Sequence, residues 1–341
     1  MAEQRVPVTI AVPTFRRPEK LAALLPLLVE QARELDATGE TRTEVVAIDN
    51  DPHGSAREVV EAAAAQAGAD GAPITLRYAH EPQPGIAAAR NRALDEAARS
   101  RLLAFIDDDE RPRPGWLREL VRVQRDAGAA LVQGWVDPEY EVPPSSWILA
   151  GRFFVRRTWP TGTALTVSAS NNVLLDVDQV RESGLRFALD LGLSGGEDTF
   201  FTSQLAARGY RLVWCAESVV TDLVPASRIT RRWVLRRALS HGNSAAVVRI
   251  RLAGSPARAV AARVASAIGG AVRVVGGVLR CGLGVVTRSE VHQARGSRAA
   301  YRGVGMIVAA VGGLVQEYAR PAGPAALSST EGHEKAPKTT G

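Results

Sequence analysis

Three consecutive aspartates, Asp107, Asp108 and Asp109, are the residues of this chain whose type and spacing point most directly to chemistry. They follow an apolar run, residues 102–106, that is typical of a buried strand. Ligands bind at the carboxyl ends of strands in an open α/β sheet, so these acids would face a ligand. Adjacent carboxylates repel one another, and Mg²⁺ held by one or two carboxylates together with substrate phosphates offsets that repulsion. A solvated turn and helix N-cap before the prolines that follow is the alternative.

The elements around these acids alternate between strand-like and helix-like runs. Strands are predicted at 8–12, 45–48, 74–78 and 102–106, and helices at 19–35 and 86–98. Strands separated by helices of this length indicate right-handed crossovers and a mostly parallel sheet. We therefore predict an α/β fold with a Rossmann-like, mostly parallel sheet flanked by helices.

The loop after the first strand excludes a dinucleotide-binding domain. Residues 13–18 contain no glycine, whereas a Gly-x-Gly-x-x-Gly turn is required there, and the chain has no Gly-x-x-x-x-Gly-Lys phosphate loop. Strands that end in polar or acidic groups recur instead, at Thr14, Asp49 and the three aspartates. That layout suits a nucleotide whose phosphates are held through a metal ion.

Five short motifs occur in a characteristic order. They are residues 12–18, 48–51, 84–91, 105–109 and 195–199. Over about the first 225 residues this series resembles that of family 2 glycosyltransferases. The resemblance implies the GT-A fold, a nucleotide-diphospho-sugar donor, a divalent cation (Mg or Mn) and sugar transfer with inversion at the anomeric carbon.

The resemblance also implies which residues bind the donor. The set is Pro13, Thr14, Arg16, Asp49, Arg90, Asn91, Asp107 and Asp108. Pro13, Thr14 and Asp49 would lie against the base or ribose, and Asp107 would meet the ribose or sugar. Ordinary turn residues, an Asx turn after Asp49 and a solvated helix face at Arg90 are the structural alternatives.

The metal set implied by the same family comparison is Asp109, Asp107 and Asp222. Relatives often place a histidine after the segment 214–220 to complete the metal site, whereas this chain has Thr221 and Asp222 there. A carboxylate is a reasonable ligand for Mg²⁺ or Mn²⁺. The five histidines lie far apart and show no zinc-like spacing.

The motif at 195–199 supplies the expected catalytic pair. In the family this acidic pair provides the general base, and we assign Asp198 as the base and Glu197 as its support. Ser194 and Glu197 also fit the spacing of a helix capping box, so a structural role is sufficient for Glu197. The cap does not explain Asp198.

Weaker patterns concern the acceptor and the diphosphate. Asn171 and Asn172 resemble the acceptor-side loop of the family, although small residues entering a strand are the alternative. Arg228, Arg232 and Arg236 would share one helix face at i, i+4 spacing. With Trp233, Arg232 could capture a diphosphate, or the face could be solvated or in contact with a membrane.

Three tryptophans could form a wall that stacks against sugar rings. They are Trp135, Trp147 and Trp159. Buried tryptophan is the more common outcome.

Composition limits the compartment and the partners. The chain has 341 residues, a net charge of +6 and two distant cysteines, Cys215 and Cys281, which give no disulfide framework. No signal peptide pattern precedes the first strand, so we expect a reducing cytoplasm. The basic excess begins at Arg228, but no nucleic-acid-binding motif accompanies it, and we expect no nucleic-acid partner.

The C-terminal region is expected to be helical. Residues 253–286 are rich in Ala, Val and Gly, and Arg258, Arg273 and Arg280 would project from one side of a helix. The apolar stretch 303–315 is too short to span a membrane unaided. Two interfacial helices in peripheral contact with anionic lipid are favoured, and a helical hairpin packed on protein is the alternative.

These patterns predict three segments and one function. The segments are a catalytic domain over 1–225, a basic and amphipathic helical region over 226–320 and a disordered tail over 321–341. The function is metal-dependent, inverting glycosyl transfer to a glycan or lipid-linked acceptor at the cytoplasmic membrane face, in cell-envelope or exopolysaccharide synthesis. Transfer to a soluble small molecule and a non-catalytic nucleotide-sugar or nucleic-acid binding protein are the alternatives.

Overall fold

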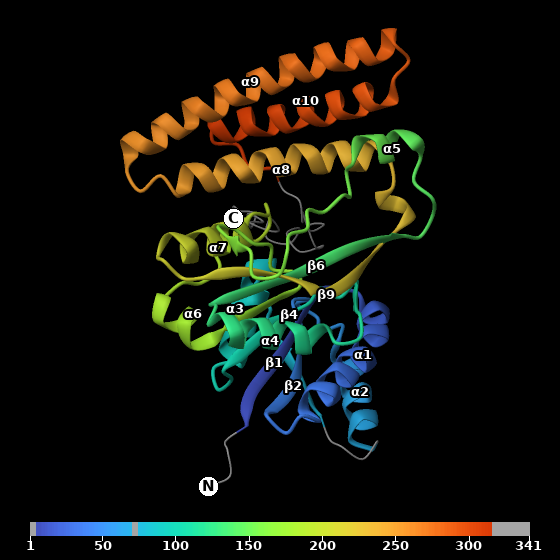
Figure 1. Ribbon diagram of the computed structural model, residues 1–341, viewed down its shortest axis with the longest axis vertical. Helices are drawn as coiled ribbons and strands as arrows, with labels where there is room; N and C mark the ends of the chain where they lie inside the picture. The colour runs from blue at the N-terminus through green and yellow to red at the C-terminus, as the bar shows by residue number, and fades with distance from the viewer. Residues whose placement is uncertain (1–4, 70–73, 316–341) are drawn as a thin grey trace, which may run out of the picture.

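The computed structural model describes residues 5–69 and 74–315, and a twisted sheet forms its centre (Figure 1). The strands are β1 (Val6–Thr14), β2 (Thr41–Asp49), β3 (Thr75–His80), β4 (Leu102–Phe105), β5 (Glu110–Pro112), β6 (Leu131–Tyr140), β7 (Ala164–Leu165), β8 (Val173–Asp176) and β9 (Leu212–Val224). The predicted tail at 321–341 and the end of the predicted helical region, 316–320, lie outside the described residues.

Helices connect and cover these strands. They are α1 (Pro18–Asp36), α2 (Arg57–Ala69), α3 (Ile86–Glu96), α4 (Trp116–Ala127), α5 (Ser146–Gly151), α6 (Val177–Ser183), α7 (Glu197–Ala207), α8 (Arg231–Arg251), α9 (Pro256–Val286) and α10 (Glu290–Ala310), with short 3-10 turns at Leu189–Leu191 and Ala226–Arg228. All four strands and both helices predicted before the acids are present.

The sheet has the order β3-β2-β1-β4-β8-β6-β9-β5, with β7 added beside β9. The first four strands pair in parallel, β8 joins β4 and β6 in antiparallel orientation, and β6 pairs in parallel with β9. Because β1, β2 and β4 are parallel neighbours, their carboxyl ends meet at one edge. The predicted α/β class with a central parallel sheet is confirmed.

Apolar side chains on the two sheet faces build two cores. Val8, Ile10 and Val12 point to the face covered by α1, α2 and α4, whereas Ala11 points to the face covered by α3, α6 and α7. This alternation follows from the two-residue period of a strand. Leu21, Leu24, Leu25 and Leu28 recur at helical spacing on α1 and are fully buried.

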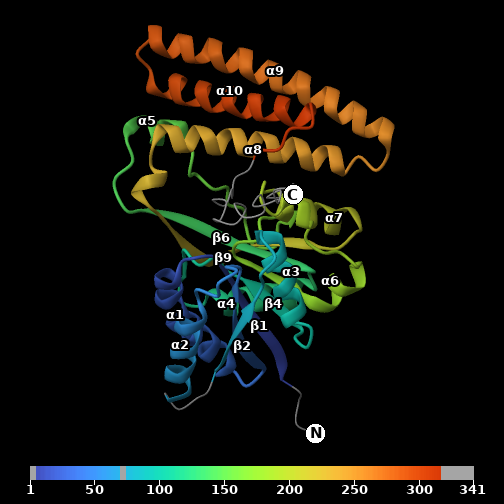
Figure 2. The same ribbon diagram turned by 180° about the vertical axis from the view of Figure 1, so that it is seen from behind.

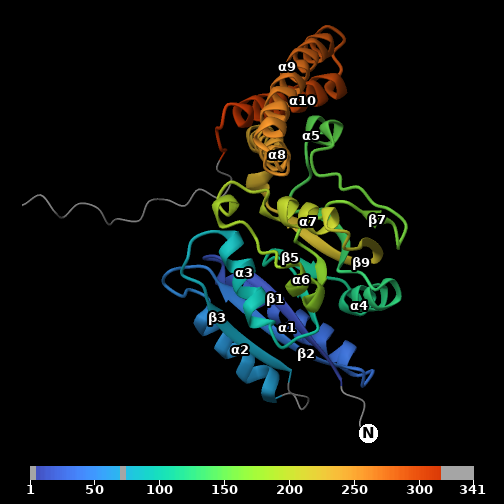
Figure 3. The same cartoon turned by 90° about the vertical axis from the view of Figure 1, so that its left-hand side faces the viewer.

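Three long helices, α8, α9 and α10, form a layer at one end of the molecule, seen from both sides in Figures 1 and 2. The first two βα units lie at the opposite end, and the view in Figure 3 shows α8 as the helix of this layer nearest the sheet. Glycines permit close packing within the layer. A Cβ on Gly242 of α8 would lie 2.1 Å from the Arg302 carbonyl oxygen of α10.

The helical layer shows how the C-terminal region packs. The end of α10 is buried at Gly303, Gly305 and Met306, as in the helical hairpin packed on protein that the sequence left as an alternative. On α9, Arg273 donates a hydrogen bond to the Gly269 carbonyl of the same helix, and Arg280 donates one to His292 Nδ1 on α10. Large apolar side chains are exposed along α9, and contact of this region with a membrane stays a prediction.

Helix α9 passes a test of length and composition for a membrane span. It has 31 residues, and only 17% of its most apolar 18-residue window is buried inside the described structure. One such helix is weak evidence, because core helices of soluble proteins can pass the same test.

Candidate active site

The carboxyl ends of β1 and β4 bring the first predicted residues together. Thr14 ends β1, and its Oγ1 donates a hydrogen bond of 2.9 Å to Asp108. Asp108 also accepts from Arg17 at 2.8 Å, and the same guanidinium reaches Asp109 at 3.2 Å. Residues distant in sequence therefore hold the acidic run at the edge where the parallel strands end.

Arg16 does not take part in these contacts. Its φ angle of 54° turns the chain, and its Nε donates to Asp51 at 3.2 Å. Arg17, which was not among the predicted site residues, contacts the acidic run instead, and the donor-binding role of Arg16 stays a prediction. The available signal was that consecutive side chains leaving a strand point in different directions.

Asp109 is surrounded by cations. Its carboxylate lies within 4 Å of Arg17 (3.2 Å), Lys20 (3.6 Å) and Arg228 (3.3 Å), although only 11% of the side chain is exposed. Arg228 comes from the short turn before α8, and Thr230 is the N-cap of that helix. The expectation that Arg228, Arg232 and Arg236 share one helix face is therefore wrong, because the helix begins after Arg228.

Strand β9 adds Asp222 to the acidic edge. In the antiparallel pairing of β5 with β9, Glu110 lies directly opposite Asp222. Glu110 was missed by the sequence argument although it continues the run of acids. It accepts a hydrogen bond of 2.8 Å from Asn171 Nδ2 and one of 3.1 Å from the Asp107 backbone N–H.

Burial and mutual repulsion shift the pKa values of these acids. Burial raises the pKa of Asp107 to about 6, Arg90 opposes the shift, and Asp109 and Asp108 add to it. Burial also raises the pKa of Asp222; the charge of Asp109 adds to that shift, and Arg156, Arg228 and Arg237 oppose it. The edge is therefore an acidic cluster whose charge is partly offset by arginines.

The donor atoms at this edge are those that a hard divalent cation prefers. Within residues 5–69 and 74–315, no three His, Cys, Asp or Glu side chains already converge as a closed metal cage. Mg²⁺ typically takes one or two carboxylates and completes its shell with water and substrate phosphates. Asp107, Asp109 and Asp222 supply carboxylate oxygens at one sheet edge, but among the described residues they do not form a ready-made metal site, and their role as ligands stays a prediction.

Asp49 and Pro13 lie inside the first βα units. Asp49 ends β2 and is fully buried, where Oδ1 accepts from the Asp51 backbone N–H at 2.9 Å and Oδ2 accepts from the Ala56 N–H at 2.8 Å. The Asx turn that the sequence allowed is therefore present. Pro13 is buried on β1 opposite Ile48.

A buried ion pair joins the motif at 84–91 to the motif at 195–199. The Arg90 guanidinium Nη1 hydrogen-bonds to Glu197 Oε1, and both side chains are at least 93% buried. Burial raises the pKa of Glu197 to about 7; the charge of Asp198 adds to that shift, and Arg90 opposes it. Because Arg90 also lowers the Asp107 pKa, one guanidinium connects the acidic edge with α7.

Two consecutive glycines shape the start of α7. Gly195 and Gly196 have φ angles of 79° and 92°, a region that favours glycine, and Gly196 is the N-cap. The capping box is therefore absent: Ser194 Oγ donates to the Leu191 carbonyl, and Glu197 binds Arg90.

Asp198 differs from Glu197 in its surroundings. It is half-exposed in the first turn of α7, and its Oδ1 accepts from the backbone N–H (2.5 Å) and hydroxyl (3.2 Å) of Thr199. Among the described residues, none donates a hydrogen bond to its Oδ2. A carboxylate in this position can accept a proton from a hydroxyl group that hydrogen-bonds to it.

Two asparagines that were predicted to line the site form hydrogen bonds within the protein scaffold. Asn91 exchanges hydrogen bonds with the backbone N–H and carbonyl of Phe187, both 2.9 Å long. Asn172 is fully buried, accepts 2.7 Å from Trp116 Nε1 and donates to the Trp135 and Ser218 carbonyls. In this arrangement both have structural roles, while Asn171 reaches the acidic edge through Glu110.

The three tryptophans do not form one wall. Trp147 is buried in a cluster with Val234 and Ala294, whereas Trp159 packs edge-on against Trp214 with 5.0 Å between ring centroids. Trp147 and Trp159 belong to different clusters, so the sugar-stacking wall that the sequence allowed is not formed by them, and Trp147 is buried as is more common. Trp233 stacks on Phe154, and Arg232 is exposed on α8.

The comparisons with known proteins agree with this arrangement of motifs. The sequence profile of glycosyl transferase family 2 matches residues 9–174. The succinoglycan biosynthesis protein ExoM of Rhizobium meliloti is 33% identical over 245 residues, which cover 72% of this chain and 75% of ExoM.

Solved structures similar to this chain include two proteins. The structure of S. aureus TarS 1–349 has 13% identity and a TM-score of 0.49, over 87% of this chain and 91% of that one. A longer TarS structure is covered over 39% of its length. GalNAc-T7 with UDP, GalNAc and Mn²⁺ has 14% identity and a TM-score of 0.48, over 72% of this chain and 51% of that one.

Proposed function

Since the chain belongs to glycosyltransferase family 2, and is therefore a glycosyltransferase with a GT-A fold, we propose that it transfers a sugar with inversion from a nucleotide-diphospho-sugar to a glycan or lipid-linked acceptor. The similarity to a succinoglycan biosynthesis protein supports an acceptor in polysaccharide synthesis. The reaction takes place at the cytoplasmic face of the cell membrane.

The observation that carries this proposal is the acidic edge beside three cations. Asp107 and Asp109 follow β4, Asp222 lies opposite Glu110 on β9, and Arg17, Lys20 and Arg228 contact Asp109. Asp109, Asp107 and Asp222 would hold a divalent cation, which when bound neutralises charge on the donor diphosphate. When the donor binds, Arg228 and Lys20 release the Asp109 carboxylate and bind phosphate oxygens of the donor.

Asp198 acts on the acceptor. Its carboxylate accepts the proton of the acceptor hydroxyl while that oxygen bonds to the anomeric carbon and the bond to the diphosphate breaks. Inversion requires the base on the far side of the sugar from the leaving group, within hydrogen-bond reach of the hydroxyl. Glu197 is less suited, because it is buried and paired with Arg90.

Arg90 and Glu197 are positioning residues in this proposal. Their ion pair fixes the first turn of α7 against α3 and so sets where Asp198 points. Gly85 supports the same junction: a Cβ on it would meet the Gly192 backbone at 3.3 Å, and the Ile86 N–H donates to the Gly192 carbonyl.

A thermal-shift screen of nucleoside diphosphates and their sugars with Mn²⁺ tests the donor. A ligand that binds only the folded state raises the unfolding midpoint with the logarithm of its concentration. The best donor is then incubated with glycan and lipid-linked acceptors, and NMR of the product reads the anomeric configuration. Retained configuration, or no metal-dependent shift by any nucleotide, would contradict the proposal.

A further inference from the structure

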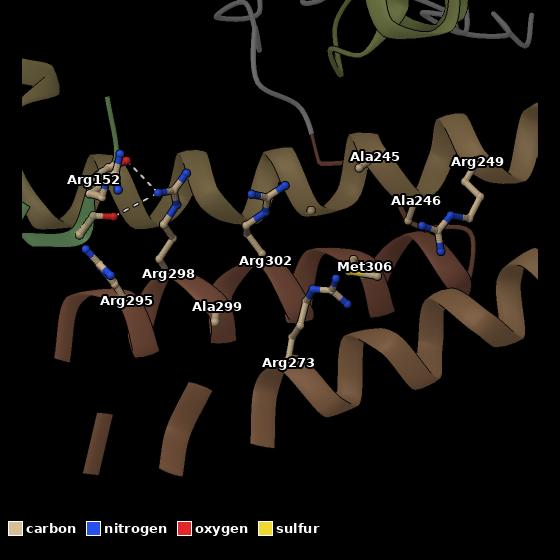
Figure 4. Close-up of a pocket in the computed structure, with 12 residues that line it drawn as sticks. Arg152, Ala245, Ala246, Arg249, Arg273, Arg295, Arg298, Ala299, Arg302 and Met306 are labelled. Carbon is tan, nitrogen blue, oxygen red and sulfur yellow. Dashed lines mark hydrogen bonds between the residues drawn. The ribbon is translucent and has the colours of Figure 1, made fainter. Parts of the chain in front are cut away.

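A cavity of about 540 Å³ lies within the helical layer, and none of its lining residues belongs to the acidic edge (Figure 4). Its charged lining consists of six arginines: Arg152 after α5, Arg249 on α8, Arg273 on α9, and Arg295, Arg298 and Arg302 on α10. Arg249, Arg273 and Arg302 project from three different helices into the same space (Figure 4). None of the described residues that line the cavity is acidic.

Within residues 5–69 and 74–315, no carboxylate offsets the positive charge of this cavity. Among the described residues, none of the six arginines forms an ion pair. Arg298 donates instead to the carbonyls of Gly151 (3.1 Å) and Arg152 (2.8 Å), and Arg295 donates to that of Ala150 (3.1 Å). These carbonyls at the end of α5 carry only partial negative charge.

Burial and mutual repulsion act on two of these arginines. Burial and the neighbouring arginines lower the pKa of Arg298, and burial and Arg273 lower that of Arg302. Guanidinium groups crowded into one cavity cost stability unless an anion offsets them. The cavity is therefore suited to a ligand with more than one negative charge.

The arrangement favours phosphate as that anion. A guanidinium presents parallel N–H groups that bind two phosphate oxygens at once, and several guanidiniums can surround one tetrahedral group. The size of the cavity accommodates a phosphate or diphosphate ester and excludes a globular acidic partner.

The exposed face of α9 favours a lipid as the source of this phosphate. The helix that contributes Arg273 leaves a continuous apolar face exposed, and four of its residues, Ile268 (61%), Val272 (66%), Val275 (60%) and Leu279 (69%), recur at helical spacing. An exposed apolar face next to a basic site is the combination that binds the acyl and headgroup regions of an anionic membrane.

We propose that the arginine cavity binds the phosphate headgroup of an anionic lipid while the exposed face of α9 lies in the acyl region. The site is separate from the donor site and does not depend on the proposed transfer reaction. It recognises the phosphate itself, so a membrane that is anionic through another group binds less tightly.

Vesicle co-sedimentation of the full chain tests this site. The vesicles are phosphatidylcholine with phosphatidic acid, or with oleate at equal surface charge. The test variant is Arg249→Gln/Arg302→Gln, which leaves the contacts of Arg295 and Arg298 with α5 in place. The matched control is Arg42→Gln/Arg99→Gln, two exposed arginines remote from the cavity in the sequence.

We expect wild type and the control to bind phosphatidic acid vesicles more tightly than oleate vesicles. The cavity variant should lose about 25-fold in affinity for phosphatidic acid vesicles, at about fivefold for each arginine. Equal loss in both variants, equal binding to both kinds of vesicle, or unchanged binding by the cavity variant would each overturn the proposal.

A second measurement, made without vesicles, distinguishes binding of a lipid headgroup from binding of free phosphate. Inorganic pyrophosphate is added in EDTA, and the unfolding midpoint is measured. A midpoint that rises in wild type but not in the cavity variant, without vesicle binding, would overturn the lipid assignment. If the glutamine variant does not fold, Arg249→Lys/Arg302→Lys keeps the charge and loses the paired N–H groups, and it should lose the preference for phosphatidic acid.

Discussion

The acidic edge and the arginine cavity both gather like charges, but the chain compensates them differently. Asp109 lies within 4 Å of Arg17, Lys20 and Arg228. Among the described residues, the cavity arginines Arg295 and Arg298 donate hydrogen bonds only to backbone carbonyls. A site that must exchange ligands in each reaction cycle benefits from internal partners that take the place of the ligand. A site without a carboxylate partner among the described residues is open to an anionic ligand from outside the chain.

The largest effect is expected at the proposed base. Asp198→Asn should lower turnover by about 100-fold or more, because a general base typically contributes a rate enhancement of that size. Its donor affinity should stay close to that of wild type. Turnover and donor binding are measured separately. Asp190→Asn, which changes an exposed acid in the preceding segment, is the control. Near wild-type turnover in Asp198→Asn would remove Asp198 from the mechanism.

Asp109→Asn should weaken Mn²⁺ and donor binding together. We expect a loss of at least about tenfold, since even residues that only support a metal ligand contribute 10- to 100-fold. Isothermal titration with and without Mn²⁺ measures both affinities. Asp126→Asn, an exposed acid on α4, should change neither. Weakened donor binding with unchanged Mn²⁺ affinity would mean that Asp109 positions cations and does not bind the metal.

Arg90→Gln should destabilise the fold by about 3–5 kcal/mol at pH 8, because removing one partner leaves the other charge buried. Urea unfolding measures the change, and Arg90→Gln/Glu197→Gln should recover part of it. Failure of the double variant to recover stability would show that packing of Arg90 over Phe187, 5.8 Å away, matters more than charge.

The pH dependence of stability should report Glu197. Its pKa is raised to about 7 in the folded protein, above the ordinary 4.5, so the folded state keeps a proton that the unfolded chain releases. This contribution is complete below about pH 4.5 and is lost as the pH rises through 7. The free energy of unfolding of wild type should therefore fall relative to Glu197→Gln between these values. Parallel curves for the two proteins would contradict the assignment.

The smallest effect is expected in the arginine cavity. Arg249→Gln should change the free energy of unfolding by no more than about 0.5 kcal/mol, and the change should be towards stability at low salt, because one repelling charge is removed. Salt titration of the unfolding midpoint measures this. A clear loss of stability, as at Arg90, would show that the cavity arginines have internal partners after all.

Local patterns in the sequence determined which segments form the strands and which acids follow them. Apolar runs at 8–12 and 102–106 fix β1 and β4, since a buried strand needs apolar side chains on both faces. Placing the acids at the carboxyl edge then needs only the parallel order of these strands. The GT-A fold and the motif positions could be predicted for that reason.

The partners of each charged side chain were decided by the tertiary structure. A φ angle of 54° turns Arg16 towards Asp51 and leaves Arg17 for Asp108, and the start of α8 at Arg231 sets Arg228 apart from Arg232. A sequence pattern gives the period of a helix or strand, but not where it begins to within a residue or what packs against it. One residue of helix is a rotation of 100°, enough to move an arginine from one neighbour to another. Six arginines from four segments form one cavity only because α8, α9 and α10 pack together.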